Sequence, residues 1–257
     1  MLSFAFSSGI ISRVSLCYKQ FDKSPSISYY AAHMQNAPLI LASTSPRRRE
    51  LIRLFGLDFS FFSADIDESP RASEAPDELV RRLSRAKAAV GVQRAAHPNA
   101  IVVAADTDVA IDGTVLGKPI DGADATRMLK LLRGRAHTVY SGITVAQGAR
   151  QITQIVKTIV WMRDYSDADI SAYVATGDPL DKAAAYAIQH NTFHPVERIE
   201  GCHANVMGLP LCHLYLALKE FGVAVDEPDR ACQAHLAIVC PVARDILSNQ
   251  SSVFSFQ

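Results

Sequence analysis

Residues 42–50, with the sequence ASTSPRRRE, combine residue types that bind anions. The Ser-Pro pair predicts a helix start, because serine caps helix N-termini and proline favours the first helical position. Arg47 and Arg48 then fall in the first turn, where the helix dipole disfavours cations. A bound anion would compensate for this, and two guanidinium groups beside free backbone N–H groups suit a phosphate. A solvated basic surface, with Glu50 as a local partner, explains the same residues equally well.

Lys87 occupies an unexpected position on a helix predicted for residues 76–96. It lies four residues after Leu83 and three before Val90, on the apolar face that should contact the core. An ammonium group there needs an anionic partner, or its stem must cover the edge of that face while the charge reaches water. Both interpretations remain open.

Asp106 ends the apolar run AIVVAAD at residues 100–106, which is typical of a strand covered on both faces. We expect it at the carboxyl end of that strand, where open α/β sheets place ligand chemistry. Asp108 would face the same way if the strand continued. A carboxylate here could bind a divalent ion or activate a water molecule, whereas the alternative is an aspartate that caps a turn.

Three other motifs carry weaker signals. Gly117-Lys118-Pro119 is one residue short of a P-loop and lacks its Ser/Thr, so we exclude a Walker site, although Lys118 could contact phosphate alone. Two Cys-His pairs at residues 202–203 and 212–213 match no standard zinc spacing and indicate core positions. Asp181 and Lys182, taken alone, indicate an ordinary surface pair.

The elements around these residues alternate between strands and helices. A strand at 38–43 precedes the arginine helix, and Asp112-Gly113 predicts a tight hairpin turn. Asp121 can cap a helix that ends at Gly134. Further strands are predicted at 137–146 and 151–162, and further helices after Ser166 and at 209–221. Because hairpins interrupt the strand–helix alternation, we predict an α/β fold with a mixed sheet.

The amino-acid composition limits the classes of protein to which the chain can belong. The 26 basic and 26 acidic residues cancel, which gives no reason to expect a nucleic-acid polymer or a membrane as partner. Five cysteines form no disulfide framework and favour a reducing compartment such as the cytoplasm. Residues 1–35 form a basic, serine-rich leader, either an organelle import segment or an upstream extension. We predict one domain at 36–226 and a C-terminal tail at 227–257, in which residues 241–257 show no helical period.

Taken together, these segments resemble the Maf family of nucleoside triphosphate pyrophosphatases. The matching motifs, in the family's order, are LILASTSPRRRELI, DIDES, AADTDVAIDG, LGKPID, TGDPLDKAAAYAIQ and NVMGLPL, and they lie between residues 38 and 225. The resemblance implies an elongated mixed sheet flanked by helices, two lobes and a cleft between them. It also implies hydrolysis between the α- and β-phosphates of a nucleotide, with a divalent cation such as Mg²⁺ or Mn²⁺, and a possible homodimer.

The matching motifs assign the family's functional residues to positions in this sequence. Asp106 would be the general base, and Asp106, Glu68 and Asp121 would be candidates for metal contacts. The phosphate-binding and base-binding residues would be Ser43, Arg47, Arg48, Lys87, Thr107, Lys118 and Gln189. The form of the last long motif is similar to the branch that acts on dTTP and UTP, in which Arg47, Thr107 and Gln189 are tied to base choice.

Two departures from that branch stand out. Ala184, Ala187 and His190 replace residues that are usually glycine, and Asp108 replaces a residue that is usually apolar. Two alternatives therefore stay open. The protein could be a pyrophosphatase for another modified nucleotide, or a nucleotide-binding regulator of cell division without turnover.

Overall fold

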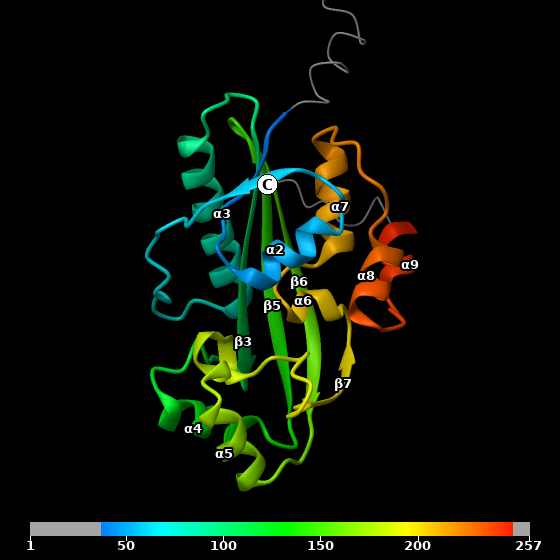
Figure 1. The fold of residues 1–257 in the computed structure, drawn as a ribbon. Helices are drawn as coiled ribbons and strands as arrows, with labels where there is room; N and C mark the ends of the chain where they lie inside the picture. Colours follow the sequence, from blue (N-terminus) through cyan, green and yellow to red (C-terminus); the bar gives the residue numbers. More distant parts are fainter. Residues whose placement is uncertain (1–36, 249–257) are drawn as a thin grey trace, which may run out of the picture.

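The computed structural model describes residues 37–248 of the 257-residue chain. The leader predicted at 1–35 lies outside these residues. One mixed sheet and the helices on its faces make up the described part, which is elongated along three long strands (Figure 1). None of the helices within residues 37–248 is long and apolar enough to span a bilayer.

The sheet has the strand order β2-β1-β3-β5-β6-β7, with β4 paired to β3 outside this path. Strand β1 is parallel to β2 and β3, and all other pairs are antiparallel, which confirms the mixed sheet. The strands are β1 (Leu39–Leu41), β2 (Phe59–Phe61), β3 (Ile101–Ile111), β4 (Thr114–Val115), β5 (Ala136–Gln147), β6 (Arg150–Met162) and β7 (Val196–Glu200).

The helices form two groups at opposite ends of the long strands (Figure 1). One group holds α2 (Pro46–Arg53), α3 (Pro76–Arg94), α6 (His203–Val206), α7 (Leu211–Glu220), α8 (Asp229–Leu236) and α9 (Ala243–Ser248). The other holds α4 (Gly122–Leu132), α5 (Asp167–Ala175) and the short 3₁₀ turns η1 (Asp178–Asp181) and η2 (Ala183–Ala185). The predicted two-lobed architecture is therefore present.

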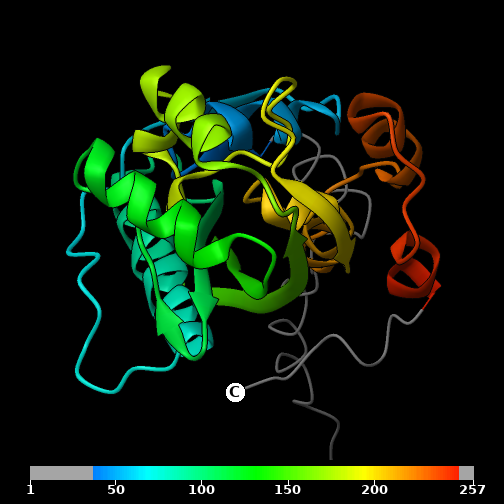
Figure 2. The same cartoon turned by 90° about the horizontal axis from the view of Figure 1, so that it is seen from below.

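Strand β3 separates two layers of the core. Val102 and Ala104 belong to the apolar cluster beneath α3, whereas Val103 and Ala105 belong to the cluster beneath α7. This division follows from the alternation of side chains along a strand. Figure 2 gives the view along the length of the molecule, with α3 and α7 well separated. Glycine at position 142 on β5 lets α3 approach closely, because a Cβ atom there would lie 2.3 Å from the Val80 carbonyl oxygen.

The local signals in the sequence located most elements correctly. Asp112 and Gly113 both have positive φ values and close the β3–β4 hairpin, as the dipeptide predicted. The Asp121 carboxylate accepts a 2.7 Å hydrogen bond from the Asp124 N–H and caps α4. Ser166 forms a capping box at the start of α5. Gly148 forms the turn between β5 and β6.

Two expectations were wrong. Asp106 does not end its strand, because β3 continues to Ile111 and pairs with β5 over the whole length from Val102 to Ala110. The stretch from residue 241, in which the sequence shows no helical period, contains the helix α9, and α8 precedes it in the predicted tail. Cys232 in α8 packs into the same apolar cluster as α7. Helices of eight and six residues are too short to establish a clear apolar period in the sequence.

Candidate active site

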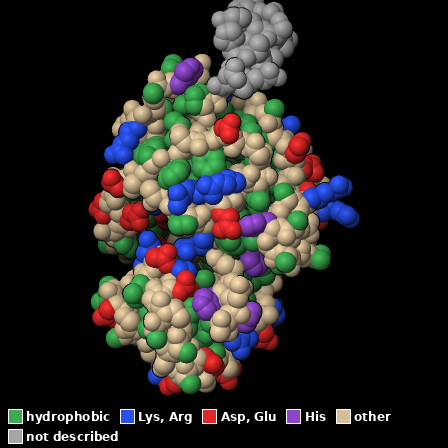
Figure 3. Space-filling model, viewed as in Figure 1, with side chains coloured by type: hydrophobic (Ala, Val, Ile, Leu, Met, Phe, Trp, Pro, Cys, Tyr) green, Lys and Arg blue, Asp and Glu red, His purple; other side chains and the backbone are tan. Residues whose placement is uncertain are grey.

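A cavity of about 350 Å³ lies between the two lobes. Figure 3 shows a depression there in which basic and acidic side chains gather. Nine of the ten predicted site residues line it: Ser43, Arg47, Arg48, Glu68, Lys87, Asp106, Thr107, Lys118 and Gln189. Asp121 does not line it, and its carboxylate is used instead as the cap of α4.

The cavity lies beside a gap in the pairing of β3. On one edge, β3 pairs with β1 only over Ile101 to Val103 and with β4 only at Ala110 and Ile111. The opposite edge is paired continuously with β5. Asp106 and Thr107 fall within this gap, so they can face a ligand although they lie in the middle of a strand.

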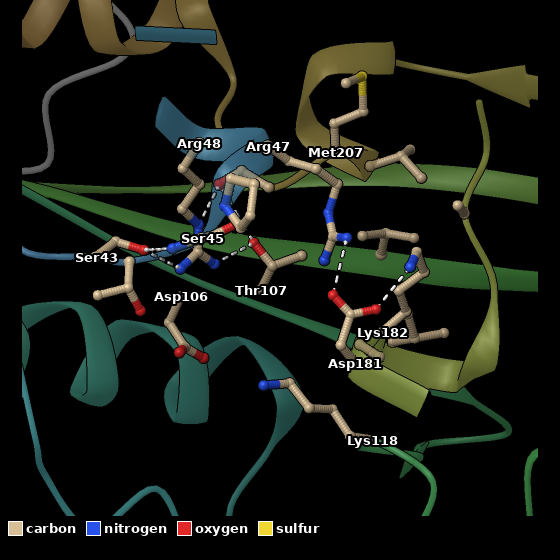
Figure 4. Close-up of a pocket in the computed structure, with 18 of the residues that line it drawn as sticks. Ser43, Ser45, Arg47, Arg48, Asp106, Thr107, Lys118, Asp181, Lys182 and Met207 are labelled. Carbon is tan, nitrogen blue, oxygen red and sulfur yellow. Dashed lines mark hydrogen bonds and ion pairs between the residues drawn. The ribbon is translucent and has the colours of Figure 1, made fainter. Parts of the chain in front are cut away.

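Arg48 connects three elements around the cavity. Its guanidinium donates hydrogen bonds to the Gly208 carbonyl oxygen at 2.9 Å, the Thr107 hydroxyl at 3.1 Å and the Ser43 hydroxyl at 3.4 Å (Figure 4). Burial lowers the pKa of Arg48, an effect that the charge of Asp106 partly opposes. The three nitrogen atoms of a planar guanidinium can each donate to a different acceptor, whereas lysine has a single nitrogen atom and cannot replace this arrangement. Arg48 therefore joins α2 to β3 and to the loop before α7.

Gly208 is suited to this close approach. Its φ of +103° is one that side-chain-bearing residues rarely adopt. A Cβ atom there would lie 3.2 Å from Nε of Arg48 and 3.3 Å from the Thr107 hydroxyl oxygen. The glycine thus leaves space for the arginine to reach the carbonyl oxygen of residue 208.

Arg47 reaches across the cavity to the other lobe. Its guanidinium lies 3.6 Å from the carboxylate of Asp181, which also accepts a 2.6 Å hydrogen bond from Lys182 (Figure 4). Lys182 additionally contacts the Asp178 carboxylate at 2.9 Å and is buried. The interpretation of Asp181 and Lys182 as an ordinary surface pair was therefore wrong. Both residues line the cavity, and the signal that could have indicated this is the motif in which they lie.

Lys87 has the anionic partner that one interpretation required. Its ammonium lies 2.6 Å from the Asp106 carboxylate and 2.7 Å from the Glu68 carboxylate. Lys87 and Asp106 are buried, whereas the side chain of Glu68 is half exposed. Partial burial raises the pKa of Glu68. The hydrogen bond and the charge of Lys87 lower it by a larger amount, so that the pKa of Glu68 lies below its ordinary value.

Lys118 and Gln189 complete the cavity from the second lobe. Lys118 follows the β3–β4 hairpin and extends toward Asp106 (Figure 4). Gln189 is exposed in the loop that follows η2. The 3₁₀ turn η2, which precedes that loop, contains two alanines in the left-handed region, Ala184 at φ +56° and Ala185 at φ +60°. The first of these is one of the positions at which the sequence departs from glycine.

Two carboxylates of the cavity suit a divalent ion. Mg²⁺ takes oxygen ligands, often one or two carboxylates together with substrate phosphates. Asp106 and Glu68 already converge on one positive charge, the Lys87 ammonium. Within residues 37–248, no three histidine, cysteine or acidic side chains are grouped so that they could hold a metal ion by themselves. The donor set therefore fits an ion whose coordination is completed by phosphate.

Comparison with known proteins shows the family to which the chain belongs. The family described as Maf-like protein matches residues 38–221. The dTTP/UTP pyrophosphatase of Geobacter metallireducens is 44% identical over 190 residues, which cover 73% of this chain and 98% of the relative. The dTTP/UTP pyrophosphatase of Myxococcus xanthus is 46% identical over 185 residues, which cover 72% of this chain and 93% of the relative.

A solved structure of a HAM1 protein from Coxiella burnetii aligns with 50% of this chain and 74% of its own length. Its sequence identity is 15% and its TM-score 0.36, which is too distant a likeness to bear on function. The family match, by contrast, spans most of the chain, and the curated relatives align over nearly their whole length. This chain is a member of the Maf family.

Proposed function

We propose that this protein hydrolyses nucleoside triphosphates to the monophosphate and pyrophosphate, with dTTP and UTP as preferred substrates. The observation that carries the proposal is the convergence of Arg47, Arg48, Lys87 and Lys118 on the same cavity as Asp106. A triphosphate has about four negative charges, and its cleavage depends mainly on positioning and charge stabilisation. Four cations that converge on one cavity suit that task.

The chemistry follows from these side chains. Lys118 and the two arginines bind the triphosphate oxygens and neutralise the charge that accumulates on the leaving pyrophosphate. The Asp106 carboxylate accepts a proton from a water molecule, whose oxygen then attacks the α-phosphorus. The bond from the α-phosphorus to the bridging oxygen breaks, and that oxygen leaves with the pyrophosphate. Lys87 holds the Asp106 carboxylate in place through the 2.6 Å hydrogen bond.

A divalent cation is part of the proposal. Asp106 and Glu68 would hold it together with the substrate phosphates. When bound, such an ion supplies positive charge that polarises phosphoryl oxygens and orients the water.

Base preference is assigned to the loop that holds Gln189. Uracil and thymine present carbonyl groups and an N–H, and a side-chain amide can meet both kinds of group at once. An exocyclic amine, as in cytosine, would place an N–H donor of the base against the N–H donor of the Gln189 amide. Arg47 lines the same cavity as Gln189 and contacts Asp181 in η1, which would link base binding to the phosphate side of the cavity. The preference for dTTP and UTP also rests on the two relatives named above.

The test is product analysis with a panel of ribo- and deoxynucleoside triphosphates in the presence of Mg²⁺ or Mn²⁺. We expect monophosphate and pyrophosphate in equal amounts, fastest from dTTP and UTP. Diphosphate with inorganic phosphate as products would contradict the cleavage position. Equal rates on all bases, or a higher rate on a modified nucleotide, would contradict the base preference. Tight nucleotide binding without any turnover would instead support the alternative function, a nucleotide-binding regulator of cell division.

A further inference from the structure

Ser141 bears a buried hydroxyl group behind the wall of the cavity. It lies on β5 directly opposite Thr107 on β3, is fully buried, and is not among the residues that line the cavity. Its hydroxyl oxygen lies 2.7 Å from that of Thr107. Side chains directly opposite each other on antiparallel strands point to the same face, so the strand register brings the two hydroxyl groups together. The proposed reaction does not use Ser141.

Ser141 belongs to a closed ring of five hydrogen-bonded residues that includes Arg48. The Ser141 hydroxyl donates to the Asn205 carbonyl oxygen at 3.2 Å, and the same oxygen accepts a 2.9 Å hydrogen bond from the Gly208 N–H. The Gly208 carbonyl oxygen accepts from Nε of Arg48 at 2.9 Å, and Nη2 of Arg48 donates to the Thr107 hydroxyl at 3.1 Å (Figure 4). The contact between Thr107 and Ser141 closes the ring. One network therefore holds two of the three guanidinium nitrogens of Arg48.

The fixed donors and acceptors of this ring set the direction of its hydroxyl protons. A guanidinium can only donate, and a carbonyl oxygen can only accept. With the Ser141 proton on the Asn205 carbonyl oxygen, the Thr107 proton points to Ser141. The Thr107 oxygen is then free to accept from Arg48. The reverse direction would send the Thr107 proton to the Gly208 carbonyl oxygen, which lies at 3.5 Å and already accepts from Arg48. The shorter contacts favour the first arrangement.

The acceptor beyond Ser141 is itself held in place. Asn205 in α6 is fully buried, and its side-chain amide donates to the Thr158 hydroxyl at 3.0 Å and to the Val139 carbonyl oxygen at 3.3 Å. These contacts join α6 to β5 and β6, so the Asn205 carbonyl oxygen has a fixed position. A hydroxyl group can otherwise rotate to suit its partners. Ser141 thus transmits the order of the sheet to the Thr107 hydroxyl.

We propose that Ser141 is a positioning residue for the phosphate-binding Arg48, because it directs the Thr107 hydroxyl so that its oxygen accepts from the guanidinium. The inference rests on the proposed function, since it assumes that Arg48 binds substrate phosphate. Without the Ser141 acceptor, the Thr107 proton can turn to the Gly208 carbonyl oxygen, where it competes with Arg48. The guanidinium would then be held less firmly in the cavity.

Kinetics with dTTP tests this role. Ser141→Ala removes the hydroxyl, and we expect kcat/KM to fall about fivefold, the value of one typical hydrogen bond. Ser141→Thr keeps the hydroxyl and should restore most of that loss. The matched control is Thr144→Val, because Thr144 is fully buried on the same strand and bonds to Ser84 and Thr153, and none of these three residues lines the cavity. Its kcat/KM should stay unchanged. An unchanged kcat/KM in Ser141→Ala, or an equal loss in the control, would overturn the proposal.

A double-mutant cycle shows whether the effect acts through Thr107. Thr107→Val removes the hydroxyl that links Ser141 to Arg48, and it should itself lower kcat/KM. Adding Ser141→Ala to this variant should lower kcat/KM little further, because residues that act through one another are not additive. Full additivity would overturn the proposal, since Ser141 would then act by a route that does not include Thr107.

Proton exchange at Arg48 separates this inference from the activity itself. In the nucleotide-free protein, the Nε–H proton of Arg48, which bonds to the Gly208 carbonyl oxygen, should exchange with water faster in Ser141→Ala than in the unmodified chain. Its NMR signal is identified by its absence from Arg48→Lys. The rates in Ser141→Thr and Thr144→Val should stay close to that of the unmodified chain. Unchanged exchange in Ser141→Ala would overturn the positioning role. Because this measurement needs no substrate, it decides that role even if no nucleotide is hydrolysed.

Discussion

The Lys87 ammonium on α3 donates a 2.6 Å hydrogen bond to the Asp106 carboxylate on β3, and each side chain is less than a tenth exposed. The two residues are 19 positions apart, so the pair forms only when α3 packs on the sheet. Buried charges need such partners, because the interior solvates an isolated ion poorly. Packing of one helix therefore sets the position of the carboxylate that we assign as the base.

Replacement of Lys87 by methionine should both destabilise and inactivate the protein. Removal of one partner from a buried ion pair leaves the other charge uncompensated, which costs about 3 kcal/mol of unfolding free energy. Urea denaturation measures this loss. Lys130→Met is the control, because Lys130 forms an exposed pair with Asp167 and its replacement should have no measurable effect. Equal stability of the two variants would show that Lys87 does not compensate Asp106.

Gly208→Ala should reduce activity by displacing Arg48. The added Cβ atom would lie 3.2 Å from Nε of Arg48, at a φ that alanine rarely adopts. Gly148→Ala is the control, because Gly148 also has a positive φ, +56°, but its Cβ atom would meet nothing within 4 Å. We expect both variants to lose about 1 kcal/mol from backbone strain. Only Gly208→Ala should lose nucleotide affinity, measured by calorimetric titration, and equal affinities would contradict the role given to Arg48.

Ala184→Gly should stabilise the protein. Alanine at φ +56° bears a steric cost of about 1 kcal/mol that glycine does not. The gain is reduced by the greater freedom of glycine in the unfolded chain, so we expect a net increase of less than about 1 kcal/mol. Thermal denaturation measures it, with Ala187→Gly as the control, because Ala187 is not among the residues with positive φ. Both alanines are buried, so each replacement also removes a buried methyl group, and a change in stability of Ala184→Gly no more favourable than that of Ala187→Gly would contradict the left-handed conformation.

Stability should fall as the pH drops below about 6.5, with His137 as one cause. Burial lowers the pKa of His137 to about 4, and its Nε2 atom lies 2.7 Å from the Tyr186 hydroxyl oxygen. The unfolded chain, with a histidine pKa of about 6.5, binds more protons between these values, so unfolding is favoured as the pH falls through this window. The expected loss between pH 7 and pH 5 is about 2 kcal/mol.

The measurement is urea denaturation at both pH values. His137→Gln should remove that part of the pH dependence, whereas the exposed His97→Gln should leave it unchanged. An undiminished pH dependence in His137→Gln would contradict the assignment.

Local signals in the sequence predicted much of the fold. Helix starts at Pro46 and Ser166 and the turn at Asp112 depend on backbone preferences of a few adjacent residues. The three-residue strand β2 was not predicted, because it is defined by pairing with β1 and carries little pattern of its own. The five-residue strand β7 was missed for the same reason.

The site was predictable in residue type but not in geometry. Motif resemblance identified nine residues that line the cavity, yet it did not indicate that Arg48 is held by Gly208, 160 positions away. Nor could local pattern show that Lys182 is buried between two carboxylates, since Asp-Lys sequences are common on surfaces. The place of Asp106 within its strand depended on β5, which follows about 30 residues later and extends the pairing past the apolar run. Contacts between distant segments decide these features.

The central claim is tested most directly by the rate at which Asp106→Asn releases pyrophosphate from dTTP. The nucleotide affinity of the same variant is measured by calorimetry. Asparagine preserves the shape of the side chain but cannot accept the proton. We predict a fall in kcat of about 10²- to 10³-fold, or about 2.7 to 4 kcal/mol of transition-state stabilisation, with nucleotide affinity retained. Turnover by Asp106→Asn equal to that of the unmodified protein would contradict the assignment of Asp106 as the general base of a triphosphate-cleaving site.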